Sequence, residues 1–224
     1  MDMDHNCFNL AVWMAASNNA SMLEKDKYHY MDLQFASRTQ FGRDPRCCDW
    51  IDYEELAKLL QCGPDRDYKI QNCSTILLPY FRDRNYILFI FDMGNKIVHI
   101  LDPHSPKLWY SGLDPIMPYN GILEIVLNYF SFSMTLVNPA WKENVYLWHR
   151  QLKLYLPKAM DWKLAGFLVY NYLKLWNGER LSSFVNIRSD SLRTEFLVHI
   201  LKSSANECTY DIPGELQDLL KLIN

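Results

Sequence analysis

The sequence predicts an α+β fold in which helical segments flank a central sheet. Three short apolar segments follow one another between residues 74 and 102, and a segment that is apolar on nearly all sides begins at Gly166, as is typical of a buried helix. The chain of 224 residues is 49% hydrophobic and 14% aromatic, so it can bury a sizeable core. It has no internal repeat and no Gly/Ser-rich linker, and we therefore expect one domain over residues 1–224.

The N-terminal part is expected to contain two helices. Apolar side chains recur at helical spacing over residues 7–17, which predicts a short amphipathic helix. Residues 17–27 are polar and are expected to form a loop, whereas residues 29–40 fit no single pattern. From Asp52, the segment DYEELAKLLQCGP has acids in its first turn and a Gly-Pro stop signal at 63–64, so it is predicted to be a helix.

The middle of the chain predicts a sheet that is covered on both faces. The segments STILLPY, NYILFIFD and KIVHILD have strand length and are almost continuously apolar. The residues MGN between the last two segments are typical of a hairpin turn, and DPHSP predicts another turn after the third strand.

The remaining part predicts more helices and one return to the sheet. NGILEIVLNYFSFSM is expected to be a helix, VYLWHRQLKLYLP contains an alternating section that suits a strand, and GFLVYNYLKLW is expected to be a buried helix. Residues 190–203 predict a helix begun by Asp190 or Ser191. IPGELQDLLKLI predicts a last helix with Pro213 near its start.

Charge and cysteine content narrow the classes of partner. The formal net charge of −3 gives no basic field, so we expect no nucleic-acid partner. The N-terminus MDMDHNCF lacks the basic region of a signal peptide, and we identify no apolar run of membrane-spanning length, so we expect no membrane partner.

The cysteines form no CxxC pair and no regular framework, and we expect reduced thiols, an intracellular location in the cytoplasm or nucleus, and neither a metal nor a cofactor. They are Cys7, Cys47, Cys48, Cys62, Cys73 and Cys208.

Four stretches, over roughly residues 65 to 210, resemble the ubiquitin-like protease family, the SUMO-deconjugating cysteine proteases related to adenovirus protease, and its plant branch in particular. They are ILLPYFRDRNYILFIFD, KIVHILDP, YLPKAMDWKLAGFLVYNYL and LRTEFLVHIL…NE…IP. The resemblance implies a papain-like (adenain-like) fold with a central mixed sheet flanked by helices. It also implies a groove for an extended C-terminal tail beside a broad surface for a ubiquitin-like domain.

The resemblance places the family's catalytic positions on residues that mostly lack the required chemistry. Asn85 stands at the position of the base His, Ala159 at that of the oxyanion Gln and Ala165 at that of the nucleophilic Cys, whereas the orienting Asp is kept as Asp102. Asp102 lies 17 residues after Asn85, which suits neighbouring strands of a hairpin.

These replacements predict a protein without protease activity. A methyl group cannot form an acyl-enzyme, an amide does not accept a proton near pH 7, and alanine has no oxyanion donor. A deliberate exchange of a catalytic cysteine would explain Ala165 but neither Asn85 nor Ala159, so we favour natural degeneration.

Several of these residues also have purely structural interpretations. Asp102 precedes Pro103 and is expected to cap a turn, and His99 is expected to be a satisfied residue of the sheet rather than a base. A triad of Asp102, His104 and Ser105 is disfavoured because neighbours on one turn rarely have the needed geometry. Cys73 suits a small buried hydrophobe, and Cys208 a thiol in a loop.

The leading hypothesis is a catalytically inactive protease homologue that acts by binding or sequestering a protein, either a ubiquitin-like modifier or an unrelated partner. Tyr86, Trp141 and Trp162 are candidate partner-binding residues, because aromatic side chains often anchor interfaces. An active peptidase with a displaced pair is one alternative, and a structural subunit of an oligomer is another. The candidates for that pair are Cys73 or Cys208 with His99 or His149.

Overall fold

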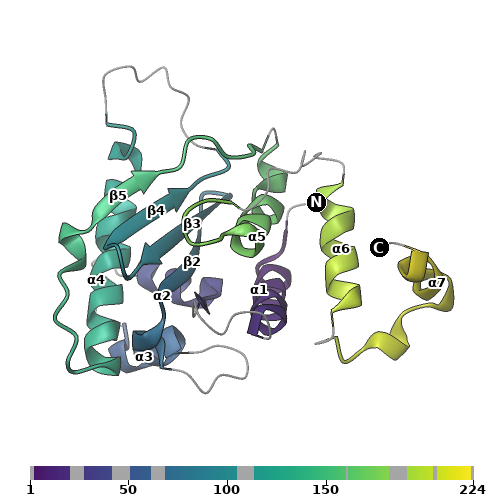
Figure 1. Ribbon diagram of the computed structural model, residues 1–224, viewed down its shortest axis with the longest axis horizontal. Coiled ribbons are helices and arrows are strands. Elements are labelled where there is room, and N and C mark those ends of the chain that lie inside the picture. The colour runs from purple at the N-terminus through teal and green to yellow at the C-terminus, as the bar shows by residue number, and fades with distance from the viewer. Residues whose placement is uncertain are drawn as a thin grey trace.

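The protein is built around a five-stranded mixed sheet, as a computed structural model shows (Figure 1). The structure describes residues 3–20, 28–41, 51–61, 69–104, 114–159, 161–181, 191–203 and 206–222. The strands are β1 (Tyr28–Tyr30), β2 (Thr75–Arg82), β3 (Asn85–Asp92), β4 (Ile97–Leu101) and β5 (His149–Leu152), in the spatial order β1-β2-β3-β4-β5. The three central strands are antiparallel, whereas β1 and β5 pair in parallel with β2 and β4.

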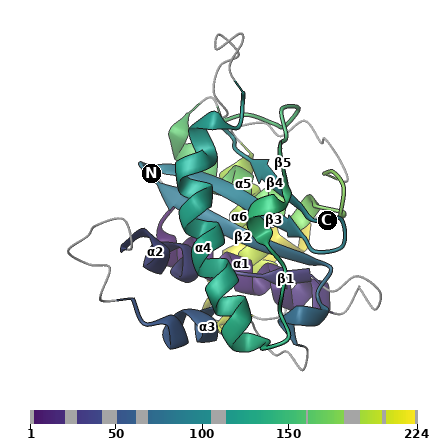
Figure 2. The same cartoon turned by 90° about the vertical axis from the view of Figure 1, so that its left-hand side faces the viewer.

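Helices cover both faces of this sheet, and the α+β prediction is confirmed. The α-helices are α1 (His5–Ala20), α2 (Leu33–Phe41), α3 (Tyr53–Gln61), α4 (Asn120–Val137), α5 (Ala165–Leu175), α6 (Leu192–Lys202) and α7 (Gly214–Leu222). Figure 2 shows α4 on one side of the sheet and α5 on the other. The helices α2 and α3 contribute side chains mainly to the α4 side, and α1 and α6 to the α5 side.

The alternation of side chains along β3 divides the core into two layers. Leu88 and Ile90 face α5 and α1, whereas Phe89 and Phe91 face α4, because successive strand residues point to opposite faces. Phe91 stacks on Phe130 of α4, with ring centroids 4.3 Å apart. The strands predicted at 74–80, 85–92 and 96–102 therefore form the buried centre of the fold as β2, β3 and β4.

The N-terminal region differs from the sequence prediction in two places. Helix α1 begins at His5, earlier than predicted, because the Asp4 carboxylate accepts a hydrogen bond from the Asn6 N–H at 2.8 Å. It also continues through Ala20, so residues 17–20 of the predicted loop are helical; no Gly or Pro interrupts the helix there. Residues 29–40, which fitted no single pattern, span parts of β1 and α2.

The helical segment that contains α4 is long and apolar enough to cross a membrane, judged by length and composition alone. The window Met117–Val137 has a mean hydropathy of 1.2, and 44% of it is buried inside the protein. Its buried side chains include Leu123, Val126 and Phe130, which pack in the layer beneath the sheet. The buried helix of a globular core meets the same criteria, so the window is weak support for a span.

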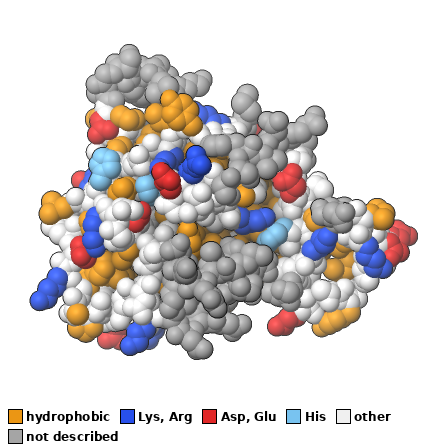
Figure 3. Space-filling view, viewed as in Figure 1, with side chains coloured by type: hydrophobic (Ala, Val, Ile, Leu, Met, Phe, Trp, Pro, Cys, Tyr) orange, Lys and Arg blue, Asp and Glu red, His pale blue; other side chains and the backbone are white. Residues whose placement is uncertain are grey.

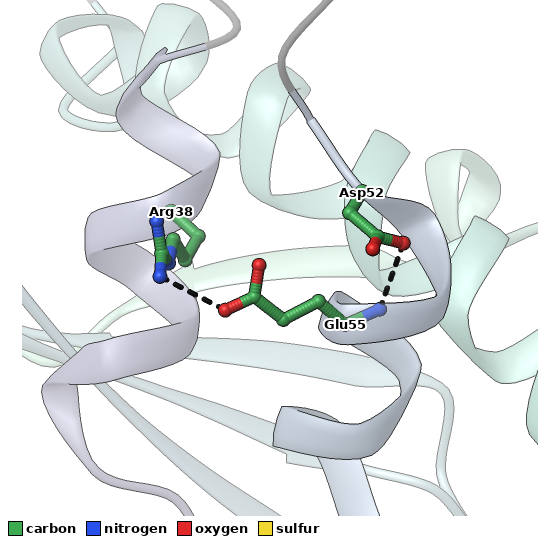
Figure 4. Close-up of polar contacts among 3 residues, drawn as sticks. All are labelled: Arg38, Asp52 and Glu55. Carbon is green, nitrogen blue, oxygen red and sulfur yellow. Dashed lines mark hydrogen bonds and ion pairs between the residues drawn. The ribbon is translucent and has the colours of Figure 1, made fainter.

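Helix α3 shows how local signals place an element. The Asp52 carboxylate accepts hydrogen bonds from the N–H groups of Glu54 and Glu55 at 2.8 and 3.1 Å, as an N-cap residue does (Figure 4). The Glu55 side chain also forms an ion pair with Arg38 of α2 at 2.9 Å, but both side chains are about half exposed. The predicted stop at 63–64 lies outside the described residues.

We expect the cap to stabilise the protein more than the ion pair does. D52A should lower the free energy of unfolding by about 1 kcal/mol, whereas E55Q should lower it by roughly 0.5 kcal/mol or less, because exposed ion pairs are screened by solvent. Urea unfolding of both variants at pH 7 measures the two changes. A larger loss in E55Q than in D52A would contradict this ranking.

His99 is a buried residue of β4, as predicted. Its Nδ1 lies 3.0 Å from Oε1 of Gln151 on β5, and its ring packs 5.0 Å from that of Trp176. Burial, together with the positive charge of Lys153, lowers the pKa of His99 to about 4. The imidazole is therefore neutral in the folded protein at pH 7.

This lowered pKa predicts a loss of stability in mild acid. Between about pH 6.5 and pH 4, His99 is protonated in the unfolded chain but neutral in the folded protein. The free energy of unfolding therefore decreases as the pH is lowered through this window. The contribution between pH 7.5 and pH 5 is about 2 kcal/mol. H99Q should lose that part of the pH dependence in urea unfolding, whereas H149Q, which alters an exposed histidine on β5, should keep it.

The C-terminal residues form an arm beside α6, on the side away from the sheet (Figure 1). Helix α6 is followed by a 3₁₀ turn, η6 (Thr209–Asp211), and then by α7. Helix α7 confirms the helix predicted at the end of the sequence. No residue of α7 is buried, and Leu216, Leu219 and Leu222 are exposed. Figure 3 shows hydrophobic side chains on the surface of this arm.

Candidate functional site

A polar network joins the start of β3 to the turn after β4. The Asn85 Nδ2 donates to Oδ1 of Asp102 at 3.1 Å. The antiparallel register of β3 and β4, in which Leu88 lies opposite Leu101, brings these two side chains to the same end of the hairpin. The predicted proximity of positions 85 and 102 is thus present in the structure.

His104 belongs to the same network. Its N–H donates to Oδ1 of Asp102 at 2.7 Å, so Asp102 caps the turn as predicted, and its Nδ1 lies 3.0 Å from Oδ1 of Asn85. The carboxylate of Asp102 only accepts, so the amide of Asn85 must present Nδ2 to it and Oδ1 to the imidazole. The Nδ1–H of His104 therefore donates to Oδ1 of Asn85.

Two tyrosines complete the surroundings of Asp102. The Tyr119 hydroxyl donates to Oδ2 of Asp102 at 2.7 Å, and both side chains are buried. Burial, with the nearby Asp102 charge, raises the pKa of Tyr119 and of Tyr172 above the usual tyrosine range, so both hydroxyls stay protonated donors. The Tyr172 hydroxyl of α5 donates to the carbonyl of Pro157.

The start of α5 lies against this end of the sheet. Asp161 caps a 3₁₀ turn, η5 (Trp162–Leu164), by accepting from the Lys163 N–H at 3.0 Å, and α5 follows with Ala165 as its first residue. The Ala159 N–H donates to the carbonyl of Pro103 at 3.2 Å, so the loop before α5 contacts the turn that Asp102 caps.

The chain's own N-terminal segment covers the start of α5. A Cβ built on Gly166 would lie 3.0 Å from Cβ and 3.1 Å from Sδ of Met3, and 3.2 Å from Cε2 of Tyr86. The Tyr86 hydroxyl donates to the carbonyl of Met3 at 2.9 Å. Met3 is 6%, Tyr86 3% and Ala165 0% exposed, so solvent does not reach residue 165.

The site therefore combines a rigid polar network with a closed helix start. Asn85 contacts Asp102, and the Ala159 N–H contacts Pro103. Gly166, the residue after Ala165, lies against Tyr86, the residue after Asn85. None of the side chains at positions 85, 102, 159 and 165 is a nucleophilic thiol or an imidazole base, and their interpretation as former catalytic positions stays a prediction.

The candidate partner-binding aromatics have different exposures. Tyr86 is covered by Met3 and offers no surface to a partner in this state, and Trp141 is partly buried in the layer with Phe130 and Trp148. Trp162 is 38% exposed. Of these three, Trp162 alone keeps the exposure that an interface anchor needs, and its role stays a prediction.

The residues proposed for a displaced catalytic pair are spread over the fold. Cys73 is buried before β2, Cys208 is exposed at the start of η6, and His149 is exposed on β5. Cys47, Cys48, Cys62 and Ser105 lie outside the described residues. Among the described residues, no group of three or more His, Cys, Asp or Glu side chains is arranged to hold a metal ion.

Sequence reasoning missed two parts of this site. Tyr119 stands in a turn that no motif marks, and Met3 reaches Gly166 only because α1 packs beside α5. The Met3–Gly166 contact has one weak signal in the sequence, a small residue at 166 and an apolar residue just before the helix cap at Asp4. Sequence alone does not link segments so far apart.

Solved structures of SUMO proteases share this fold. The SUMO protease Ulp1 with its catalytic cysteine oxidised to a sulfonic acid matches with a TM-score of 0.57 and 10% identity, over 89% of this chain and 77% of that one. A de-sumoylating protease matches with a TM-score of 0.57 and 10% identity, over 99% and 87% of the two chains. The Ulp1 protease domain in complex with Smt3, the yeast SUMO orthologue, matches with a TM-score of 0.52 and 11% identity, over 89% and 76%.

No protein-family model and no curated protein sequence matches the chain. The predicted papain-like fold, with a mixed sheet flanked by helices and a buried helix starting near Gly166, is that of the Ulp1 protease domain.

Proposed function

We propose that this protein is a non-hydrolytic relative of the SUMO proteases that acts by binding or sequestering a protein partner. The observation that carries the proposal is the residue at the start of the buried helix: Ala165 is the first residue of α5 and is fully buried. Acyl transfer needs a nucleophilic atom and a base within reach of it, and Ala165 and Asn85 supply neither.

The retained scaffold supports binding as the remaining activity. Asp102, Asn85 and Tyr119 still form an ordered network, and the fold matches a protease domain that was solved in complex with Smt3. The partner we propose is a ubiquitin-like modifier, recognised through its folded domain, because Met3 closes the start of α5. By the same resemblance, we propose a member of the plant-type branch that acts in the cytoplasm or nucleus.

A binding experiment with a defined probe tests this function. A purified SUMO-type domain that carries a C-terminal extension is immobilised, and the protein is titrated over it. We expect saturable binding, and the extension should remain attached when the complex is recovered and weighed by mass spectrometry. Ubiquitin with the same extension serves as the comparison. Binding to neither domain would contradict the modifier as partner, and alkylation-sensitive removal of the extension would contradict the loss of catalysis.

An oligomeric role is a second candidate, since α7 leaves Leu216, Leu219 and Leu222 exposed. A helix of nine residues is marginal by itself in water, so a contact on its apolar face would stabilise it. Light scattering over a range of concentrations separates the two functions, because the binding proposal does not need self-association.

A further inference from the structure

A cationic and aromatic cluster borders the closed helix start, and within it Arg84 and Trp162 are exposed whereas Lys163 is half-buried. The guanidinium carbon of Arg84 lies 5.1 Å from the centroid of the Trp162 ring, and Nζ of Lys163 lies 5.7 Å from it. Arg84 belongs to the turn between β2 and β3, whereas Trp162 and Lys163 belong to η5. We call these three residues the Arg84–Trp162–Lys163 patch.

Neither cation of the patch has an acidic partner among the described residues. The neighbouring Asp83 forms its ion pair with Arg82 at 2.9 Å, and the carboxylate of Asp161 accepts from the backbone N–H of Lys163 rather than from its ammonium group. Two positive charges therefore share one indole ring without a carboxylate, in a chain whose net charge is −3. This arrangement leaves both cations available to an anionic group.

The backbone at Arg84 is an unfavourable place for an arginine. Arg82 pairs with Asn85, so Asp83 and Arg84 form a two-residue hairpin loop, and their φ angles are +51° and +64°. Such loops favour Asn-Gly, and a residue with a side chain costs about 1–2 kcal/mol in the left-handed region. Arginine does not stabilise the turn at this position, but the turn places the arginine side chain over the ring of Trp162.

The patch lies next to the end of the sheet that holds Asn85 and close to the start of α5. Arg84 immediately precedes Asn85, and Trp162 lies three residues before Ala165, which is closed to solvent. A partner that approaches this end of the sheet meets the exposed side chains of Arg84 and Trp162 and not the buried helix start.

We propose that the Arg84–Trp162–Lys163 patch is the docking surface for an acidic segment of a protein partner. Carboxylates of that segment pair with the guanidinium of Arg84 and the ammonium of Lys163, and an apolar side chain between them packs on the indole of Trp162. This inference rests on the proposed binding function and names the chemistry of the partner surface.

Fluorescence anisotropy with labelled peptides tests the inference. The probes are a peptide of six glutamates and one leucine, and a peptide in which lysines replace the glutamates. We expect the acidic peptide to bind saturably, more tightly at low salt, and the basic peptide not to bind. R84E/K163E should weaken the acidic peptide by about 10-fold or more, whereas R84K should retain most of the affinity.

The control is a double reversal elsewhere on the surface with the same change in net charge. Lys58 and Lys142 are exposed, and K58E/K142E should bind the acidic peptide about as the unaltered protein does. Equal losses in the two double variants, no saturable binding of the acidic peptide, or no loss in R84E/K163E would each overturn the inference. Circular dichroism confirms that both variants fold. A SUMO-type domain that fails to bind while the acidic peptide binds in this pattern would remove the proposed modifier and leave the patch in place.

Discussion

A SUMO-type domain that carries a fluorophore on its C-terminal tail should remain intact in the presence of this protein, with release no faster than in buffer alone. Loss of the nucleophile in a serine protease lowers the rate by about 10⁶-fold, and under the proposed function Asn85 also offers no base and Ala159 no oxyanion donor. An active SUMO protease under the same conditions is the positive control. Release that stops on thiol alkylation would show that another cysteine serves as nucleophile.

Two separate causes should prevent hydrolysis at this site, namely the lack of a base and the burial of residue 165. The variant A165C tests them separately. The variant introduces a nucleophilic atom at position 165 but no base at position 85, because the Asn85 amide donates to Asp102 and does not titrate near pH 7, so its release rate should also equal that of buffer. Access is measured by the alkylation of the introduced thiol, with peptide-resolved mass spectrometry. The thiol introduced at position 165 should react far more slowly than that of Cys208, which is exposed, because Ala165 is completely buried beside Gly166 and Met3.

The elements of the sheet could be predicted because their signals are local. The segments around Ile87 and Val98 are almost continuously apolar and are separated by a short turn, so strand type and pairing follow from adjacent residues. The three-residue β1 lacks such a signal, since it exists only through its parallel pairing with β2, which lies more than forty residues later. The extent of α1 was also missed, because a polar composition at residues 17–20 does not by itself end a helix.

The contacts of the site could be predicted only where one hairpin fixes them. Asn85 and Asp102 meet because β3 and β4 are joined by a short turn, so the spacing along the chain determines the contact. The sequence placed His104 only in a disfavoured triad with Asp102 and Ser105, and the structure gives its imidazole Asn85 as a partner. Met3 and Tyr119 reach the site through the packing of whole helices and loops, which single-sequence patterns do not encode.

The largest effect on stability is expected from removal of the Asp102 carboxylate. In D102A, the Tyr119 hydroxyl, the Asn85 amide and the His104 N–H all lose their acceptor at a position that is 5% exposed. A buried polar group left without a partner costs about 1–3 kcal/mol, so we expect D102A to lower the free energy of unfolding by about 3 kcal/mol in total. Urea unfolding at pH 7 measures the change.

The matched variant Y119F separates the network from simple loss of packing. It removes one donor but keeps the ring and leaves the carboxylate with two donors, so it should lower the free energy of unfolding by about 1 kcal/mol. The hydrogen bonds of Asp102 hold the hairpin end, the turn after β4 and the start of α4 together. Near-zero changes in both variants would mean that the network adds no stability, and would leave Asp102 without the structural role that its three hydrogen bonds indicate.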